Sequence, residues 1–243
     1  MANFSSASAE SSNLVVSMGT SGAVRLSSKN ISTDQNMRTF CYPIKEDEYI
    51  IGGATNNGAV VMQWLKDSIL KTEDTFETLF SHAESISAGS EGLIFLPYIL
   101  GERAPIYNSK ARGVFFGLNI QHQQAHLIRA TMEGITFCLY SIGKLLMENT
   151  TVKGIHASGG FAKSPVWLQI LADVFNLPVV VAETVESSAL GAVKLACEAL
   201  ELPFTINQQF ETVYKPIETN HLVYKKSFQK FERIYEALKD EMN

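Results

Sequence analysis

The chain has 243 residues, of which 46% are hydrophobic and 19% are charged, and its formal net charge is −5. This composition is typical of a folded globular protein, and a negative charge with scattered Lys and Arg argues against nucleic-acid binding. The longest apolar runs, such as Leu93–Leu100 and Leu177–Ala182, are too short to span a bilayer, so we expect no membrane contact.

The cysteines and the N-terminal residues indicate the compartment. Cys41, Cys138 and Cys197 are far apart and form no CxxC pair, which favours reduced thiols over a disulfide framework or a zinc site. The opening stretch "MANFSSASAESSN" lacks the basic and apolar regions of a signal peptide. We therefore expect a cytoplasmic protein.

The first part of the chain predicts short strands followed by helices. Apolar runs at Leu14–Met18 and Ala23–Ser28 flank the turn "GTSG" and predict a β-hairpin. The spacing of apolar residues becomes helical from Asn57 to Ile69. The remaining elements predicted here are strands at Cys41–Ile44 and Tyr49–Ile51 and a helix at Thr75–Ser85.

The second part predicts alternating strands and helices. A buried apolar run, "GLIFLPYILGERAP", ends in a polar turn and precedes the longest helical pattern. Ser164-Pro165 is a good N-cap and first turn for a helix. Alternation of strands and helices implies a parallel crossover, so the chain is predicted to be one α/β domain with a mixed sheet. The predicted elements are helices at Gln123–Glu148, Val166–Phe175, Ser187 or Ser188 to Leu200 and Lys226–Lys239, and strands at Ile155–Ser158 and Val179–Ala182.

Three glycine loops are candidates for binding an anion or a nucleotide. Gly19–Gly22, with the hydroxyls of Thr20 and Ser21, has the backbone freedom and donors to hold phosphate, although an ordinary hairpin turn explains it as well. Gly58 begins a helix whose dipole favours an anion, but turn and cap chemistry is the preferred interpretation there. Gly159-Gly160 lies between a strand and a helix, where α/β sheets bind ligands, and tight packing is an equal alternative.

The histidines and two acidic residues are weaker candidates. His122 and His126 are four residues apart, but no third ligand accompanies them, so a solvated or capping role is favoured over a metal site. Glu183 and Glu186 are interpreted as charges of a loop and a helix start. The C-terminal stretch is interpreted as an amphipathic surface helix.

Four separated stretches resemble, in order, motifs of the FGGY carbohydrate kinases. "GTSG" is similar to a phosphate loop of that family, and "GVFFGLNIQHQQAHLIRATMEG" resembles its long second signature. "SGGFAKSPVWLQILADVFNLPV" resembles its adenosine motif, and "ESSALGAVKLA" the helix after it. The resemblance covers essentially the whole chain. It implies a ribonuclease-H-like fold of the actin, hexokinase and Hsp70 type, in which ATP lies between two lobes and a sugar occupies the cleft.

The resemblance also implies ATP with Mg²⁺ as cofactors, and it implies which residues contact the ATP. Thr20 would lie at the phosphates, Gly58 and Gln63 at the helix that begins there, and Gly160 with Ser164 at the adenine and ribose. Ser164 stands where the family has Asn, and Ala59 where many relatives have a second Gly. No metal ligand is assigned to the protein. The full set of implied ATP contacts is Gly19, Thr20, Ser21, Gly58, Gln63, Gly159, Gly160 and Ser164.

Within the family, "LPYILGERAPIYNSKARGVFFGL" is most similar to gluconate kinases and next to xylulose kinases. The implied reaction is transfer of the γ-phosphate of ATP to a sugar or sugar acid, with gluconate favoured and xylulose the alternative. Glu102 and Arg103 are expected to brace the interface between the lobes. Partners would be ATP, the sugar and an amino-terminal lobe, and a homodimer is left open.

The family's amino-terminal lobe, with its catalytic Asp and most of its sugar site, has no counterpart in the sequence. "ANFSSASA" resembles the segment just after that Asp, so residues 1–243 are expected to form a single C-terminal nucleotide-binding domain. We assign no catalytic residue to it and expect it to be inactive alone. A non-catalytic nucleotide-binding or interaction module is the alternative. A nicotinamide-binding domain is disfavoured, because Gly159-Gly160 lacks a third glycine and no acidic residue ends the next strand before Glu183.

Overall fold

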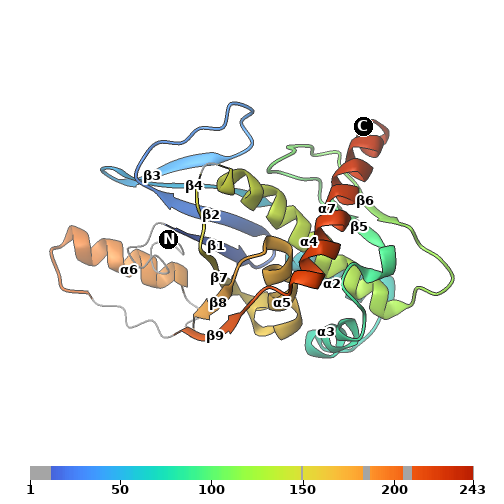
Figure 1. Ribbon diagram of the computed structural model, residues 1–243. Coiled ribbons are helices and arrows are strands. Elements are labelled where there is room, and N and C mark those ends of the chain that lie inside the picture. Colours follow the sequence, from blue (N-terminus) through green and yellow to red (C-terminus); the bar gives the residue numbers. More distant parts are fainter. Residues whose placement is uncertain (1–11, 149, 183–186, 205–209, 243) are drawn as a thin grey trace.

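A seven-stranded mixed sheet runs through the molecule, and α4, α5 and α7 are grouped on one side of it (Figure 1). The computed structural model describes residues 12–148, 150–182, 187–204 and 210–242. The strand order is β3-β4-β2-β1-β7-β8-β9. These strands are β1 (Asn13–Met18), β2 (Gly22–Ser28), β3 (Phe40–Lys45), β4 (Glu48–Thr55), β7 (Gly154–Gly159), β8 (Val179–Ala182) and β9 (Phe210–Tyr214).

The sheet combines an antiparallel half with a parallel centre. β1 pairs antiparallel with β2 and parallel with β7, and β7 pairs parallel with β8. β4 pairs antiparallel with both β2 and β3. Hairpins need only short turns, whereas the parallel β7–β8 pair requires the crossover through α5 that the sequence predicts. The predicted mixed α/β sheet is therefore confirmed.

The predicted helices are all present, with some shifted ends. The stretch predicted as one helix from Asn57 to Ile69 is α2, which begins at Ala59 and continues as a π-helical turn, Leu65–Leu70. Among the described residues, no helix is long and apolar enough to cross a membrane. The α-helices are α2 (Ala59–Trp64), α3 (Phe76–Glu84), α4 (Gln124–Met147), α5 (Pro165–Phe175), α6 (Ser187–Ala199) and α7 (Glu218–Leu238).

The sequence did not predict the start of α7 or two strands, β9 and β6 (Gly113–Phe116). α7 begins at Glu218 rather than at Lys226, because the buried carboxylate of Asp173 on α5 accepts hydrogen bonds at its start. The donors are the backbone N–H of Ile217 (2.7 Å) and the side-chain amide of Asn220 (2.9 Å). β6 is a four-residue strand paired with β5 (Ile94–Pro97). These elements depend on partners that are distant in the sequence, so the local spacing of apolar residues does not predict them.

Helix α4 lies at the centre of the hydrophobic core. Gly134 and Gly143, which weakened the prediction of a continuous helix, lie where α4 approaches its neighbours most closely. A Cβ at Gly134 would lie 2.4 Å from the carbonyl oxygen of Phe95, and one at Gly143 would lie 2.4 Å from the ring of Phe175. Both glycines are therefore explained by packing, and α4 is unbroken.

A buried ion pair connects α4 to α7 and to the turn before β5. Nε of Arg129 donates to Oε1 of Glu133 (2.8 Å), and Nη2 of Arg129 donates to the hydroxyl of Tyr224 on α7 (2.6 Å). Glu133 also accepts from Ser90 Oγ (2.9 Å) and from the backbone N–H of Gly89 (3.0 Å). Burial raises the pKa of Glu133, and Arg129 opposes that rise. One carboxylate thus holds three segments together.

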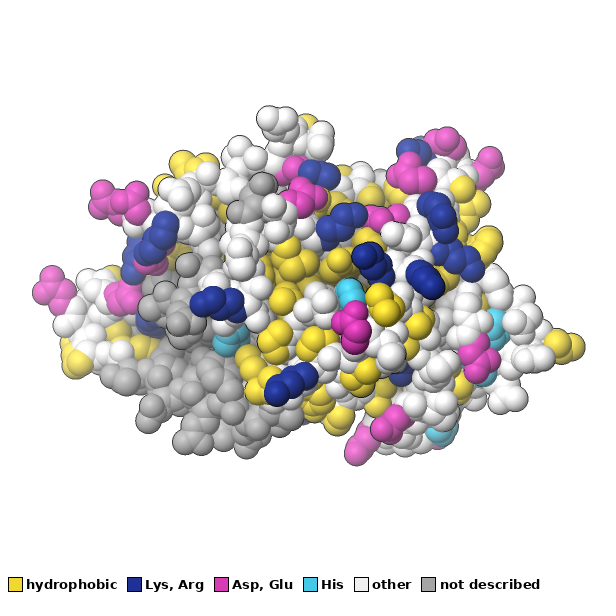
Figure 2. Space-filling view, viewed as in Figure 1, with side chains coloured by type: hydrophobic (Ala, Val, Ile, Leu, Met, Phe, Trp, Pro, Cys, Tyr) yellow, Lys and Arg dark blue, Asp and Glu magenta, His cyan; other side chains and the backbone are white. Residues whose placement is uncertain are grey.

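The surface is mixed in charge. On the face shown in Figure 2, Lys and Arg side chains are interspersed with Asp and Glu rather than gathered into one basic patch. This distribution agrees with the scattered basic residues of the sequence and gives the face no dominant sign.

His156 on β7 makes the stability of the fold depend on pH. Its Nε2 lies 2.9 Å from the side-chain nitrogen of Asn13, and because an amide nitrogen only donates, Nε2 accepts and the ring is neutral. Burial lowers the pKa of His156. Since the unfolded chain then takes up the proton more readily, stability is lost as pH falls below about 6.5.

Lowering the pH from about 7.5 to about 5.5 should lower the melting temperature of the unchanged protein. We expect this fall to be several degrees larger than the fall in His156→Gln, which lacks the buried histidine. Thermal unfolding followed by circular dichroism measures this difference. His82→Gln, at an exposed histidine, is the control and should keep the pH dependence of the unchanged protein. Equal falls in the unchanged protein and His156→Gln would contradict the assignment.

Candidate nucleotide site

The three glycine loops lie at one edge of the sheet. β1 and β4 both run antiparallel to β2, and β7 runs parallel to β1, so all three strands end at the same edge (Figure 1). At that edge Met18 pairs with Gly159, and Gly22 pairs with Thr55. Ligands of α/β sheets bind beyond the carboxyl ends of strands. Loops separated by up to 140 residues of sequence are thus brought to one place, as the order of the predicted strands and the resemblance imply.

The Gly19–Gly22 turn is exposed at this edge, and α2 supports it from one side. Its Gly19 N–H donates to the carbonyl of Ser21 (2.9 Å). The carbonyls of Gly19 and Thr20 accept from the first amides of α2, those of Ala59 (2.9 Å) and Val60 (3.3 Å). Thr20 and Ser21 are solvent-exposed, so the turn presents two hydroxyl groups to solvent. It remains a candidate phosphate loop.

The preferred interpretation of Gly58, turn and cap chemistry, agrees with its position as the N-cap of α2. A Cβ at Gly58 would lie 2.6 Å from the carbonyl carbon of Ser21 and 2.9 Å from the carbonyl oxygen of Gly19. The amides of Ala59 and Val60, which an anion would need, are bonded to the turn instead. The absence of a side chain at Gly58 therefore lets α2 pack closely against the Gly19–Gly22 turn. A direct contact from Gly58 to ATP stays a prediction.

Gly159 and Gly160 have different environments. Gly159 has a φ of +105°, and a Cβ there would lie 2.1 Å from the carbonyl oxygen of Met18. At Gly160, by contrast, a Cβ would meet no heavy atom of the described residues within 4 Å. Packing explains the first glycine, while the second presents bare backbone to open space. Packing, one of the two alternatives considered for this pair, therefore accounts for Gly159. Ligand binding, the other alternative, stays a prediction at Gly160.

Ser164 and Gln63 are engaged in local hydrogen bonds. Ser164 is the N-cap of α5, as predicted: its Oγ accepts from the backbone N–H of Trp167 (3.3 Å), and Pro165 is in the first turn. Accepting that bond leaves the hydroxyl proton of Ser164 to donate. Gln63 is exposed on α2, and its side-chain amide donates to Asp67 one turn later (2.5 Å). Their contacts to ATP stay predictions.

Glu102 braces the loop at this edge, a role that the sequence did not reveal. It is buried, and its carboxylate accepts hydrogen bonds from Thr55, Asn56 and Asn57, the loop that leads from β4 into α2. Burial raises the pKa of Glu102, and these hydrogen bonds oppose that rise. The neighbouring Arg103 donates from Nη2 to the carbonyl of Thr55 (3.1 Å). Both residues brace the loop; bracing between lobes stays a prediction.

The sequence favours a solvated or capping role for the histidines, and His126 is confirmed as part of the capping box of α4. Nδ1 of His126 accepts from the backbone N–H of Gln123 at the start of α4 (3.1 Å), and Nδ1 of His122 accepts from that of Asn119 (3.1 Å). Within the described ranges, no three His, Cys, Asp or Glu side chains cluster in a way that could hold a metal ion. Glu183, Glu186 and the stretch "ANFSSASA" lie outside the described residues.

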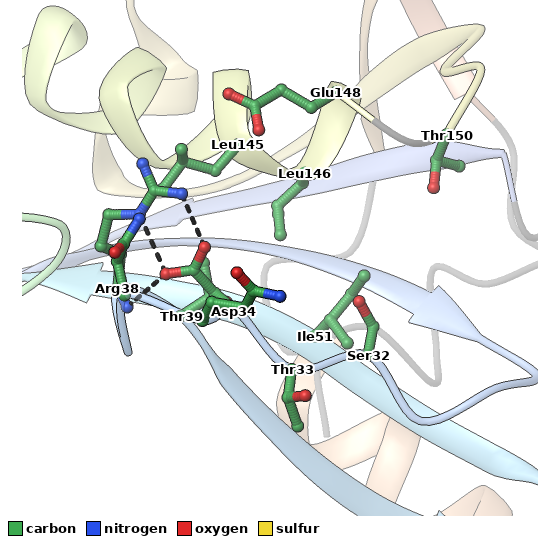
Figure 3. A pocket seen from close by; sticks show the side chains of 12 residues that line it. Ser32, Thr33, Asp34, Arg38, Thr39, Ile51, Leu145, Leu146, Glu148 and Thr150 are labelled. Carbon is green, nitrogen blue, oxygen red and sulfur yellow. Dashed lines mark hydrogen bonds and ion pairs between the residues drawn. The ribbon is translucent and has the colours of Figure 1, made fainter.

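A polar cavity of about 340 Å³ lies at the opposite edge of the sheet, between the loop after β2 and the end of α4 (Figure 3). Hydrogen bonds from Arg38 lower the pKa of Asp34 in its wall to about 2. None of the predicted ATP contacts lines this cavity. The labelled residues around it are Ser32, Thr33, Asp34, Arg38, Thr39, Ile51, Leu145, Leu146, Glu148 and Thr150.

Residues 14–200 match the profile of the FGGY family of carbohydrate kinases, C-terminal domain. The chain belongs to this family. The match includes the β1–β2 turn, the long α4 signature and the β7–α5 segment, which are the stretches that carry the resemblance in the sequence. The matched range thus includes the three glycine loops that meet at the edge of the sheet.

Individual FGGY kinases match at different levels. The gluconokinase of Bacillus subtilis (strain 168) is 42% identical over 190 residues, which is 74% of this chain and 37% of that protein. The crystal structure of gluconate kinase from Lactobacillus acidophilus superposes with a TM-score of 0.88 at 37% identity, covering 94% of this chain and 48% of that one. The structure of ligand-bound xylulose kinase from the same organism has a TM-score of 0.91 at 36% identity, covering 98% and 50%.

These matches establish the fold as that of FGGY sugar kinases, a ribonuclease-H-like mixed sheet flanked by helices, as the resemblance implies. The chain spans half or less of the length of these relatives. What the relatives bind or phosphorylate is accordingly a property of longer proteins.

Proposed function

We propose that residues 1–243 are the ATP-binding C-terminal lobe of an FGGY kinase that transfers the γ-phosphate of ATP to gluconate. The observation that carries the proposal is the meeting of the Gly19–Gly22 turn, the Thr55–Gly58 loop and Gly160 at one edge of the sheet. The 42% identity to a gluconokinase supports the choice of substrate.

Each part of the edge has a distinct role in this proposal. The hydroxyls of Thr20 and Ser21 donate to phosphate oxygens and stabilise charge that develops on the transferring group. The backbone of Gly160, which has no side chain, lies against the adenosine. The hydroxyl of Ser164 donates a hydrogen bond to the ribose. Gln63 contacts the nucleotide after leaving Asp67. Mg²⁺ arrives with the ATP phosphates, where it neutralises charge.

No catalytic base is assigned to this chain. A carboxylate of the amino-terminal lobe takes the proton from the attacking hydroxyl, and closure of the two lobes excludes water. The chain alone therefore binds nucleotide without phosphorylating the sugar. A cytoplasmic location belongs to the same proposal, and formation of a homodimer is left open.

Calorimetric titration of the chain with ATP and ADP tests the nucleotide site. We expect saturable binding of both at a stoichiometry of one. If neither nucleotide gave a heat of binding at millimolar concentration, the chain would have no preformed nucleotide site. That result would favour a module that binds only a partner lobe.

Addition of an amino-terminal lobe tests the reaction. ADP production that depends on both lobes and on gluconate is the expected result. Xylulose is the alternative substrate, because the solved xylulose kinase superposes on the chain at least as closely as the gluconate kinase. Turnover of xylulose without turnover of gluconate would overturn the choice of substrate.

A further inference from the structure

We propose that Glu102 is a positioning residue for the phosphate loop: its buried carboxylate fixes the loop Thr55–Gly58, which in turn holds the Gly19–Gly22 turn in place. The inference rests on the proposed function, since it assumes that this turn binds the phosphates of ATP. It assigns to Glu102 a role within this chain, toward the nucleotide, in addition to any contact between lobes.

The carboxylate of Glu102 is saturated with donors from consecutive residues. Oε2 accepts from the hydroxyl of Thr55 (2.5 Å) and the side-chain amide of Asn57 (3.2 Å). Oε1 accepts from the backbone N–H groups of Asn56 (2.9 Å) and Arg103 (2.7 Å). Only 3% of Glu102 is exposed, so these bonds are shielded from water. Charge-assisted hydrogen bonds are about twice as strong as neutral ones, so this carboxylate is a main constraint on the path of the loop.

Asn57 adds a second set of hydrogen bonds between the loop and the segment that precedes Glu102. Its side-chain amide also donates to the carbonyl of Gly101 (2.7 Å), and its Oδ1 accepts from the backbone N–H of Leu100 (3.3 Å). Its own backbone N–H donates to Oγ1 of Thr55 (2.9 Å). Asn57 is fully buried. The loop from β4 to α2 is therefore bonded along its length to the segment around Glu102.

The loop transmits this constraint to the turn. Gly58 follows Asn57 directly and is in contact with the backbone of Ser21, and the next two amides donate to the carbonyls of Gly19 and Thr20. Glu102 itself makes none of these bonds to the turn. It acts through the loop, which distinguishes a positioning residue from one that touches the nucleotide.

The test compares Glu102→Gln with Asp173→Asn. Both remove a buried carboxylate that accepts several hydrogen bonds, but Asp173 caps the start of α7 and contacts neither the turn nor the loop. Melting temperatures are measured for each variant. Affinities for ATP and AMP are measured below the melting temperature by competition against a fluorescent ATP analogue.

We expect both variants to melt several degrees lower than the unchanged protein. Only Glu102→Gln should lose ATP affinity, by about tenfold or more, while its AMP affinity changes by less than about threefold. A loss confined to the nucleotide with the longer phosphate chain is not expected of a general weakening of the fold.

Thr55→Val is the second variant, for the case in which Glu102→Gln does not fold. It removes the hydroxyl that donates to Glu102 while keeping the shape of the side chain, and it should show the same loss for ATP over AMP. Equal ATP affinity in either folded variant and the unchanged protein, or equal losses for ATP and AMP, would overturn the role of Glu102. Failure of the unchanged protein to bind ATP would instead overturn the proposed function.

Discussion

Gly159→Ala is expected to destabilise the protein by at least about 3 kcal/mol, because it places a side chain in a backbone conformation and a space that admit none. Its φ of +105° is rarely adopted by L-residues, and the new Cβ would lie 2.1 Å from the carbonyl oxygen of Met18. That oxygen belongs to the neighbouring strand, paired in register with Gly159, so the clash is with rigid backbone. Urea unfolding measures the loss.

Gly160→Ala, one residue later, is the matched control for stability. Its Cβ would meet no heavy atom within 4 Å in the part of the chain that the structure describes, so we expect the free energy of unfolding to stay within about 1 kcal/mol of the unchanged value. If Gly160→Ala destabilised as much as Gly159→Ala, the division of the pair into a packing glycine and an open glycine would be wrong.

The same open space makes Gly160 a probe of the adenosine site. Gly160→Val should keep the fold but weaken binding of both ATP and AMP by about tenfold or more, because its side chain would occupy the surface on which adenosine is proposed to lie. This pattern differs from that of Glu102→Gln, which affects ATP alone. Unchanged affinities in folded Gly160→Val would place the adenosine elsewhere.

Local sequence patterns predicted most of the fold because the relevant signals are local. The β1–β2 hairpin follows from two apolar runs around a glycine turn, and the start of α5 follows from Ser164-Pro165. The β7–α5–β8 crossover follows from alternation of strand and helix patterns. The start of α7 could not be predicted in this way, since it depends on Asp173, which caps it from a different helix.

The candidate site was predicted as a set of loops but not in its internal arrangement. Which glycine packs and which is open depends on the register of Met18 against Gly159, two residues that are remote in sequence. From the sequence alone, the first amides of α2 could bind an anion. Only the fold shows that they donate hydrogen bonds to the carbonyls of the turn instead. Glu102 is likewise bonded to Thr55, 47 residues away, so no spacing rule reveals its role.

Glu133→Gln is expected to destabilise the protein by about 3–5 kcal/mol, because it leaves the buried guanidinium of Arg129 without its counter-charge. Arg129 and Glu133 are 7% and 2% exposed, so water cannot replace the lost partner. The turn that Glu133 holds adds to the effect: Gly89, Ser90, Glu91 and Gly92 have φ values of +83°, +47°, +53° and +90°. Non-glycine residues in this region are strained and persist only where bonds such as those to Glu133 fix them.

An exposed ion pair supplies the control for this prediction. Glu48 pairs with Lys29 at 2.6 Å and with Lys45 at 3.4 Å, and the side chains of these lysines are 67% and 44% exposed. Because water screens both pairs, Glu48→Gln should cost less than about 1 kcal/mol. The double variant Arg129→Met/Glu133→Gln removes both buried charges and should be more stable than Glu133→Gln alone, as measured by urea unfolding. The single variant Arg129→Met completes the comparison. If the losses of unfolding free energy in Arg129→Met and Glu133→Gln simply added in the double variant, Arg129 would not be the charge that Glu133 neutralises. Recovery in the double variant would show that Glu133 stabilises the protein mainly as the counter-charge of Arg129, at the point where α4, α7 and the turn before β5 meet.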